Sequence, residues 1–266
     1  MPREITSFSN PLVKQARSLR DKKERRREGL FLAEGLRILT EAREAGFLPQ
    51  RTFFAAGQRH PLLDRLIAET EAAGGEAIET NADILHKISG KDNPQTVLGV
   101  FPAFSTRLEE LDRSAADLWI VAQALRDPGN LGTILRTGDA VGAGGLILVD
   151  ECVDPFSVEA VRASMGALFT QKIAAAPWDQ FLAWLRSGPG ELVGTSLDAT
   201  TDYQQPRYAK PCFILVGNEA QGLPAPCEQA CDLLVKIPMR GKADSLNAAV
   251  ATAVMAYEVF NQWRCK

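Results

Sequence analysis

Three polar tracts in the second half of the sequence have residue types and spacings that could do chemistry. Each follows a short apolar run that predicts a buried strand, and in open α/β sheets ligands bind outside the carboxyl ends of the strands. The first tract places Asn130 directly after the turn Pro128-Gly129, as the expected N-cap of a helix that carries Arg136. We therefore expect the three tracts to meet at one edge of a sheet.

The second tract combines flexible turns with two polar side chains. Gly217 and Gly222 enclose Asn218 and Glu219, and glycine lets a backbone take positive φ and approach a ligand closely. A tight strand-to-helix turn explains the glycines but explains the Asn218-Glu219 pair less well. Glu219 is therefore a candidate for positioning loops or a substrate.

The third tract leads into an alanine-rich final helix and has no apolar anchor between Arg240 and Asp244. It runs from Ile237 through Arg240 to Asn247, and Ser245 is the expected N-cap of the helix. A helix so rich in small residues can simply belong to the core. The loop before it is expected to be exposed or to line a cavity.

The elements that must position these tracts alternate regularly. Strands followed by helices predict βα units and a mostly parallel sheet covered on both faces. The predicted strands are 118–122, 146–149, 192–196, 213–216 and 233–237, and the helices 131–141, 156–169, 178–185 and 245–263. We expect an α/β domain over residues 118–266.

The first half predicts a smaller α/β domain over residues 1–104, followed by a polar linker at 105–117. A basic helix carries Leu12, Ala16 and Leu19 on one side. The later elements are expected to be helices at 35–45 and 61–73, the second leading to the segment 76–79, and strands at 51–56 and 96–101.

Charge is distributed unevenly along the chain. The formal net charge is −3, whereas residues 14–27 contain eight basic and two acidic residues, so this segment alone carries +6. A local basic patch on an acidic protein fits phosphate binding, and a solvated helix face explains it equally well. The basic residues are Lys14, Arg17, Arg20, Lys22, Lys23, Arg25, Arg26 and Arg27.

Several classes of protein are excluded or disfavoured. The sequence has no phosphate-binding Gly-x-x-x-x-Gly-Lys-Ser/Thr loop, which excludes an ordinary phosphate-loop nucleotide hydrolase. It also has no dinucleotide fingerprint after a strand. Both histidines, His60 and His86, lie in the first half, so the second half has no candidate Ser–His–Asp triad. Cys227 and Cys231 have no histidine nearby, so no metal site is expected and the five cysteines are expected to be reduced thiols. No apolar run approaches the roughly 20 residues of a membrane span, and no signal peptide is evident, so we expect a cytoplasmic protein.

Taken together, the tracts resemble the three motifs of the SpoU (TrmH-like) branch of the SPOUT methyltransferases. The matching segments are 130–137, 214–223, and 237–239 with 245–251, and 163–169 resembles a further family segment. Segments 9–14 and 31–35 are similar to the start of the L30e-like substrate-binding domain of this family. One departure is Ala220, where the family often has glycine.

The resemblance implies a fold and a cofactor that the residue patterns alone do not give. The C-terminal segment should form a deep trefoil knot, although knots are essentially absent from most folds. The knot should bind S-adenosylmethionine (SAM), largely through backbone groups. The matching cofactor-binding positions are Gly217, Ile237 and Leu246, with Leu197 and Met239 as further candidates.

The resemblance also implies methylation of a ribose 2′-hydroxyl in RNA by a homodimer whose partner subunits complete each active site. Arg136 should engage the target phosphate and hydroxyl, Asn130 should orient the ribose or Arg136, and Ser245 and Asn247 should hold the substrate. Arg136 cannot readily act alone as a base, because a guanidinium stays protonated. Candidate RNA-binding residues on the basic helix are Lys14, Arg17, Arg20, Arg25 and Arg26.

Two other functions remain open on sequence grounds. A non-catalytic RNA-binding protein with the same fold would retain RNA affinity without transferring a methyl group. A small-molecule α/β enzyme would show neither RNA affinity nor SAM dependence. Within the methyltransferase interpretation, the L30e-like domain favours ribosomal RNA over tRNA as the substrate.

Overall fold

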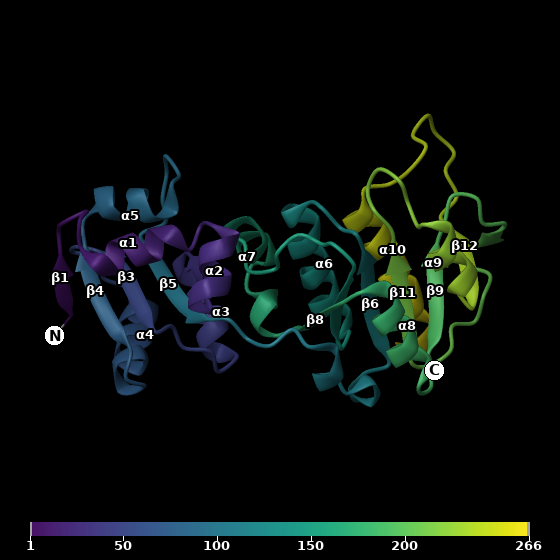
Figure 1. Ribbon diagram of the computed structural model, residues 1–266, viewed down its shortest axis with the longest axis horizontal. Helices are drawn as coiled ribbons and strands as arrows, with labels where there is room; N and C mark the ends of the chain where they lie inside the picture. The colour runs from purple at the N-terminus through teal and green to yellow at the C-terminus, as the bar shows by residue number, and fades with distance from the viewer. Residues whose placement is uncertain (1, 265–266) are drawn as a thin grey trace. The chain divides into compact units, whose positions relative to one another are not determined.

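The chain folds into two compact units, and the computed structural model describes residues 2–264 of it (Figure 1). The first unit contains the chain up to Phe104 together with Asp154–Thr170. The second contains Ser105–Val153 and the chain from Gln171 onward. Both units combine sheets and helices, so the predicted α/β class is confirmed.

The first unit is built on a mixed five-stranded sheet with the order β1-β4-β3-β5-β2. Strands β1, β4 and β3 pair in parallel, whereas β5 pairs antiparallel with β3 and with β2. Strand β2 is fully buried and was not predicted. Its five residues do not alternate between apolar and polar side chains in the way that marks a half-buried strand. The strands are β1 Arg3–Ile5, β2 Leu30–Glu34, β3 Arg51–Ala55, β4 Glu76–Thr80 and β5 Val97–Pro102.

Helices cover both faces of this sheet. Helix α1 packs against α5, while α3 and α4 pack together on the other side (Figure 1). The core on the α1 and α5 side buries Val13 and Ala16 against Ile84 and Ile88. The helices are α1 Pro11–Ser18, α2 Lys22–Glu28, α3 Leu36–Glu44, α4 Pro61–Ala72 and α5 Ala82–Ser89.

The predicted single basic helix is two helices. Helix α1 ends at Ser18, and α2 begins at Lys22 after a turn in which Leu19 is fully buried. The Asp21 carboxylate accepts a hydrogen bond from the backbone N–H of Lys23 at 2.7 Å and so caps α2. An N-cap inside a continuous run of helix-forming residues starts a new helix and divides the basic residues between two axes.

The segment Asp154–Thr170 belongs to the first unit. The second domain was expected to be continuous over 118–266, so the division of the chain differs from the expected one. Phe156 and Phe169 stack on Phe31 of β2, with ring centroids 5.0 and 6.0 Å apart. The predicted helix 156–169 is shorter: α7 spans Val158–Ser164, and a 3-10 turn follows at Ala167–Phe169. Met165 and Gly166 take left-handed φ values of 52° and 105°, which end the helix.

The second unit contains a seven-stranded sheet with the order β10-β12-β9-β11-β6-β7-β8, and every pairing in it is parallel. Strands β6 and β11 are buried along their whole length and are apolar except for Gln123 at the end of β6, as expected for a sheet covered on both faces. The strands are β6 Leu118–Gln123, β7 Gly145–Val149, β8 Lys172–Ala176, β9 Glu191–Thr195, β10 Thr201–Asp202, β11 Cys212–Val216 and β12 Leu233–Lys236.

Helices α6 and α10 pack against each other and on one face of this sheet, where they contact β7 and β11. The other face buries Trp119 and Phe213 against Phe181 of α8 and Cys227 of α9. The expected linker at 105–117 is part of this unit and contains two 3-10 turns, at Leu108–Glu110 and Arg113–Ala115. The helices are α6 Pro128–Val141, α8 Trp178–Arg186, α9 Ala225–Ala230 and α10 Ala248–Arg264.

Both predicted helix caps in the motif tracts are wrong by a few residues. Asp127, not Asn130, caps α6: its carboxylate accepts the backbone N–H of Asn130 at 2.7 Å. Asn247, not Ser245, precedes α10, and its side-chain oxygen accepts the N–H groups of Ala249 and Val250 at 2.9 and 3.3 Å. Carboxylates and amides are as effective as hydroxyls in this role, so sequence did not separate the neighbouring candidates.

Two further findings concern the cysteines and the lengths of the helices. Cys152, Cys212, Cys227 and Cys231 are free thiols, and Cys265 lies outside the described residues. Burial raises the pKa of the Cys227 thiol to about 11, with a smaller contribution from Asp150. None of the helices between residues 2 and 264 combines the length and the apolar character needed to cross a membrane.

Candidate active site

A cavity of about 430 Å³ lies at the carboxyl ends of three neighbouring strands of the second unit. Strand β9 contributes Thr195, β11 contributes Val216, and β12 contributes Val235 to its wall. The loops that follow the three strands complete it. This is where a parallel α/β sheet is expected to bind a ligand, since the strand ends and their loops meet there.

All five residues expected to contact a cofactor line this cavity. They come from three loops that are far apart in the sequence, and Leu197 is 60% exposed although it is a large apolar side chain. Its exposure at the cavity mouth leaves an apolar surface that a ligand can cover. The five are Leu197, Gly217, Ile237, Met239 and Leu246.

Two backbone hydrogen bonds close the loop after β11 between Asn218 and Gly222. The N–H of Asn218 donates to the carbonyl of Gly222 at 3.1 Å, and the N–H of Gly222 donates back at 2.9 Å. A β-carbon on Gly217 would lie 2.3 Å from the carbonyl carbon of Gly222, so only glycine fits there. Ala220 has no positive φ, so the departure from the family glycine causes no strain at this position.

Asn218 fastens this loop to the neighbouring strand end. Its side-chain amide donates to the carbonyl of Ala124 at 2.8 Å, and its side-chain oxygen accepts the N–H of Ala220 at 2.9 Å. Ala124 itself has a φ of 50°, an uncommon conformation for a residue with a β-carbon. The loops after β6 and β11 are therefore joined by a direct hydrogen bond.

The Glu219 carboxylate lies against the start of α6. It accepts the backbone N–H groups of Arg126 and Asp127 at 3.4 and 3.2 Å and the side-chain amide of Asn130 at 3.0 Å. Burial alone raises the pKa of Glu219, but these hydrogen bonds outweigh it and lower the pKa below the ordinary value. Glu219 is thus held as a carboxylate that both lines the cavity and anchors α6.

Asn130 and Asn247 extend this contact into a chain of hydrogen bonds. Asn130 is 8% exposed, and its side-chain oxygen accepts the side-chain amide of Asn247 at 2.8 Å. Because a carboxylate only accepts, Glu219 fixes the orientation of the Asn130 amide, which in turn fixes that of Asn247. The three motif tracts are therefore joined by direct contacts between Glu219, Asn130 and Asn247.

Arg136 and Ser245 stand apart from this chain of hydrogen bonds. Arg136 is exposed on α6 and, among the residues that the structure describes, forms no hydrogen bond or ion pair. At about 100° per residue, its side chain leaves α6 on a different side from that of Asn130. Ser245 is exposed, lines the cavity and has no hydrogen-bond partner within residues 2–264. The geometry leaves both side chains available to a substrate.

The cavity has four charged lining residues, and all of them except Glu219 were not selected from the sequence. Asp198, Glu219 and Glu228 line it together with Lys236, which makes two more negative than positive charges. Asp198 follows β9, so inspection of the residues after every predicted strand would have found it, whereas Lys236 lies inside the predicted strand 233–237. A cavity with this balance suits a small ligand with a net positive charge.

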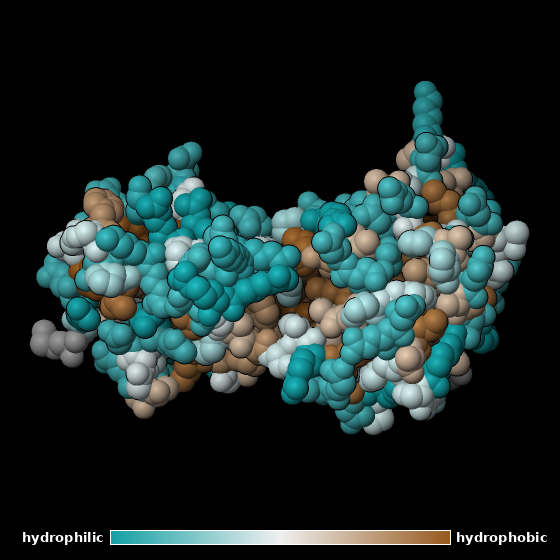
Figure 2. All heavy atoms as spheres, viewed as in Figure 1, coloured by the Kyte–Doolittle hydropathy of each residue, from teal (hydrophilic) through white to brown (hydrophobic). Residues whose placement is uncertain are grey.

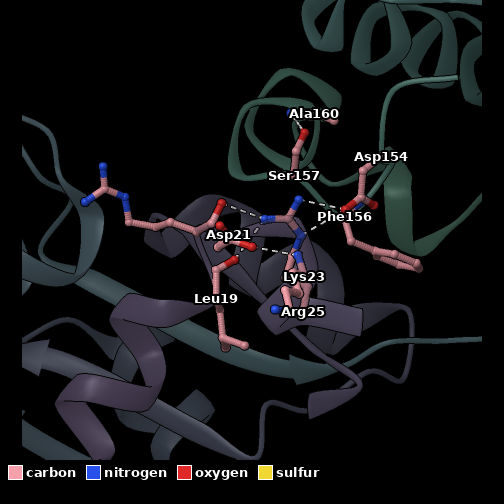
Figure 3. A network of polar contacts seen from close by, with 9 residues as sticks. Leu19, Asp21, Lys23, Arg25, Asp154, Phe156, Ser157 and Ala160 are labelled. Atoms are coloured by element: carbon pink, nitrogen blue, oxygen red, sulfur yellow. Dashed lines mark hydrogen bonds and ion pairs between the residues drawn. The ribbon is translucent and has the colours of Figure 1, made fainter. Parts of the chain in front are cut away.

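Four of the five candidate RNA-binding residues of the first unit are exposed, and the fifth is not. Lys14, Arg17, Arg20 and Arg26 lie on the surface of α1, α2 and the turn between them. Arg25 is only 6% exposed and pairs with Asp154 at 2.7 Å (Figure 3). Arg25 is therefore a structural residue that cannot reach a phosphate, and its selection from the sequence was wrong.

Comparison with known proteins identifies the family. The SpoU rRNA methylase family profile matches residues 117–257, and an MRM3-like substrate-binding domain profile matches residues 10–99. The AdoMet-bound rRNA methyltransferase from Sinorhizobium meliloti has a crystal structure that is 38% identical, with a TM-score of 0.91 over 98% of each chain.

Two curated relatives match along nearly their whole length. The 23S rRNA (uridine(2479)-2′-O)-methyltransferase of Streptomyces viridochromogenes is 32% identical over 98% of this chain and 92% of its own. The 23S rRNA (guanosine(2553)-2′-O)-methyltransferase RlmP of Bacillus subtilis is 28% identical over 97% of this chain and 99% of its own. Motif order, the joined polar side chains and these matches agree, and the chain belongs to the SpoU rRNA methylase family.

Proposed function

We propose that this protein transfers a methyl group from SAM to a ribose 2′-hydroxyl of 23S ribosomal RNA. The observation that carries the proposal is that the second and third motif tracts line one cavity, while the first is joined to both through the contacts of Asn130 with Glu219 and Asn247. Full-length relatives named as 23S rRNA 2′-O-methyltransferases support the choice of RNA.

The cavity fits SAM in size, lining and charge. Its volume of about 430 Å³ lies in the usual range of small-ligand pockets, roughly 300–1,000 Å³. Leu197, Ile237, Met239 and Leu246 offer apolar contacts, and Gly217 offers exposed backbone. SAM, when bound, supplies a methyl group activated by a sulfonium, and the excess of carboxylates at the wall suits that positive charge.

The polar side chains have separate roles in this proposal. Arg136 binds the phosphate beside the target ribose and arranges it to receive the proton that leaves the 2′-hydroxyl. Ser245 and Asn247 hold the ribose at the cavity mouth, which lowers the barrier mainly through positioning. Asn130 and Glu219 act through Asn247, since their hydrogen bonds fix its side-chain orientation.

A homodimer completes the site in this proposal. Arg136 does not line the cavity, so a second copy of the chain is the expected source of the residues still needed around the target ribose. Helix α10, which packs on the Arg136 helix, exposes Val250 by 48% and Tyr257 by 44%. Large apolar side chains exposed on one helix are typical of a surface covered by a partner.

The basic residues of α1 and α2 bind RNA in this proposal. Lys14, Arg17, Arg20 and Arg26 are exposed and would contact phosphates, which position an RNA without specifying its sequence. A ribosomal RNA substrate also supports a cytoplasmic location. The trefoil knot implied by the family resemblance stays a prediction.

The test is methyl transfer from SAM labelled on its methyl group to unmodified 23S rRNA and, separately, to tRNA. We expect alkali-stable label at a single ribose of 23S rRNA. Arg136→Ala should reduce the turnover by about 10²–10³-fold, as loss of a group that stabilises developing charge does elsewhere, while SAM affinity stays unchanged. Arg207→Ala, which removes another exposed arginine of the second unit, is the matched control.

Each result decides a different part of the proposal. Label in tRNA alone would move the substrate to tRNA. SAM binding and RNA binding without label in either RNA would favour a non-catalytic RNA-binding protein. Full activity of Arg136→Ala would remove Arg136 from the reaction.

A further inference from the structure

A hollow on the surface of the first unit lies beside the turn that joins α1 to α2. Its volume is about 570 Å³. Hydrophilic side chains dominate the surface over α2 in Figure 2. The residues that line the hollow are Lys14, Arg17, Ser18, Arg20, Asp21, Lys23 and Glu24.

The two acidic residues of the hollow already have partners, and its four basic residues do not. Asp21 caps α2, and Glu24 pairs with Arg27 at 2.5 Å. Lys14, Arg17, Arg20 and Lys23 make no ion pair with any residue between 2 and 264. Four bases and two acids leave a net charge of +2 in the lining, and the unpartnered charges are all positive.

The buried Arg25 guanidinium fixes the backbone of the turn that carries Arg20. It donates to the carbonyl oxygen of Leu19 at 2.9 Å (Figure 3). It also donates to the carbonyl oxygen of Arg20 at 2.8 Å. Its other nitrogens donate to the Asp154 carboxylate at 3.0 and 2.7 Å, which compensates the buried charge. The turn is therefore a rigid support for the Arg20 side chain.

The Arg20 side chain itself lies against Gly90, the residue that ends α5 with a φ of +70°. A β-carbon on Gly90 would lie 2.1 Å from Cζ and 2.2 Å from Nη1 of Arg20. The guanidinium occupies the space that any other residue would fill. Contact with the Gly90 backbone excludes part of the space open to this long side chain, which reduces the conformational entropy that binding must remove.

We propose that this hollow is a built site for one phosphate group of the RNA backbone, with Arg20 as its preorganised ligand. The inference rests on the proposed RNA substrate. The planar guanidinium fork of Arg20 matches two oxygens of a phosphate, and Lys14, Arg17 and Lys23 add positive charge around it. The site positions the RNA without reading its bases, since phosphates carry no sequence information.

The first test compares Arg20→Ala with Arg65→Ala, which removes an exposed arginine of α4 on the other side of the sheet. The dissociation constant of the full chain for protein-free, unmodified 23S rRNA transcript is measured over a range of salt concentrations. Loss of one phosphate contact should weaken binding about tenfold and reduce the slope of log K against log salt by about one. Equal affinities of the two variants would overturn the site.

The second test moves the guanidinium without removing its charge. Gly90→Ala displaces Arg20, whereas Gly74→Ala places alanine at a similar φ of +84° with nothing within 4 Å. Both variants carry the same backbone strain, so the expected severalfold loss of RNA affinity in Gly90→Ala alone reports on Arg20. RNA binding by Gly90→Ala as tight as that by Gly74→Ala would overturn the preorganised role.

Methyl transfer separates this inference from the proposed function. If the site is correct, Arg20→Ala raises the KM for the RNA about tenfold, in step with its weaker binding. A parent protein that binds the transcript but transfers no methyl group would overturn the proposed function and leave the affinity comparison valid. Parental transfer with unchanged affinity in Arg20→Ala would overturn the phosphate site alone.

Discussion

Two arginines were selected from the sequence as residues that contact RNA. Arg25 lies on helix α2 of the first unit, and Arg136 lies on helix α6 of the second. Arg25 of α2 is buried, and its guanidinium donates to two carbonyl oxygens and to Asp154. Arg136 of α6 is exposed and has no partner between residues 2 and 264. The same residue type therefore holds the fold together in one unit and is available to a substrate in the other.

The difference follows from how each unit presents its functional groups. In the second unit, loops after parallel strands converge on one cavity, so a position directly after a strand predicts a place at the site. In the first unit, the candidate residues form a run of charge along two short helices. A helix turns each successive side chain by about 100°, so one run supplies both buried and exposed residues.

The largest expected effect tests whether Arg25 stabilises the fold. Arg25→Ala leaves Asp154 buried without its partner, and loss of one member of a buried pair lowers the free energy of unfolding by about 3–5 kcal/mol. Urea denaturation measures it, with Arg26→Ala, the exposed neighbour, as a control that should change stability by less than about 0.5 kcal/mol. Replacing the pair together, Arg25→Met with Asp154→Leu, should recover only part of the loss, because the carbonyl oxygens of Leu19 and Arg20 and the N–H of Phe156 still lose their partners. Equal stability of Arg25→Ala and Arg26→Ala would show that Arg25 is not structural.

The next effect tests the cavity of the second unit. Gly217→Ala forces the loop after β11 away from the backbone of Gly222, because the added carbon would lie 2.3 Å from it. SAM affinity should fall at least about tenfold, or about 1.4 kcal/mol, by titration calorimetry. Gly241→Ala is the control, since nothing lies within 4 Å of its β-carbon position. Unchanged affinity in Gly217→Ala would mean that this loop does not shape the cofactor site.

A smaller effect separates two roles of Asn247. Asn247→Ala removes the N-cap of α10 and should lower stability by about 1 kcal/mol. Asn247→Asp keeps the capping oxygen but loses the amide that donates to Asn130. Thermal unfolding and methyl transfer should therefore disagree for Asn247→Asp, with stability kept and activity lost. Loss of stability without loss of activity would make Asn247 a cap only.

The smallest effect is a pH dependence at Glu219. Its pKa is lowered from the ordinary 4.5 in the folded chain, so the folded state prefers the carboxylate. The resulting stabilisation is complete above the unfolded pKa and is lost as pH falls from about 4.5 through the folded pKa. Urea midpoints measured between about pH 6 and pH 3 should fall more steeply for the parent than for Glu219→Gln. Parallel curves would contradict the lowered pKa.

The positions of the site residues were largely predictable from the sequence, and their partners were not. The family resemblance selected Gly217, Ile237 and Leu246, and all three line the cavity. The bond from Asn130 to Asn247 joins residues 117 positions apart, and no local pattern encodes such a distance. The cap of α6 was assigned to Asn130 instead of Asp127 because both residue types cap helices equally well.

The insertion of Asp154–Thr170 into the first unit was equally invisible. Phe156 and Phe169 are apolar residues that would fit any core, and the partner they stack on, Phe31, lies more than a hundred residues away. A periodic pattern says that one side of a helix is buried but not which surface covers it.

The sequence by itself determined the α/β class, the strand-end positions of the three motif tracts and the family to which they belong, because these depend on local residue order. Only the tertiary structure decided which basic side chains remain exposed and how Glu219, Asn130 and Asn247 are joined. It also decided that Gly90 leaves room for the Arg20 guanidinium. These properties depend on contacts between segments distant in the chain, where burial and hydrogen bonding are set by packing and not by neighbouring residues.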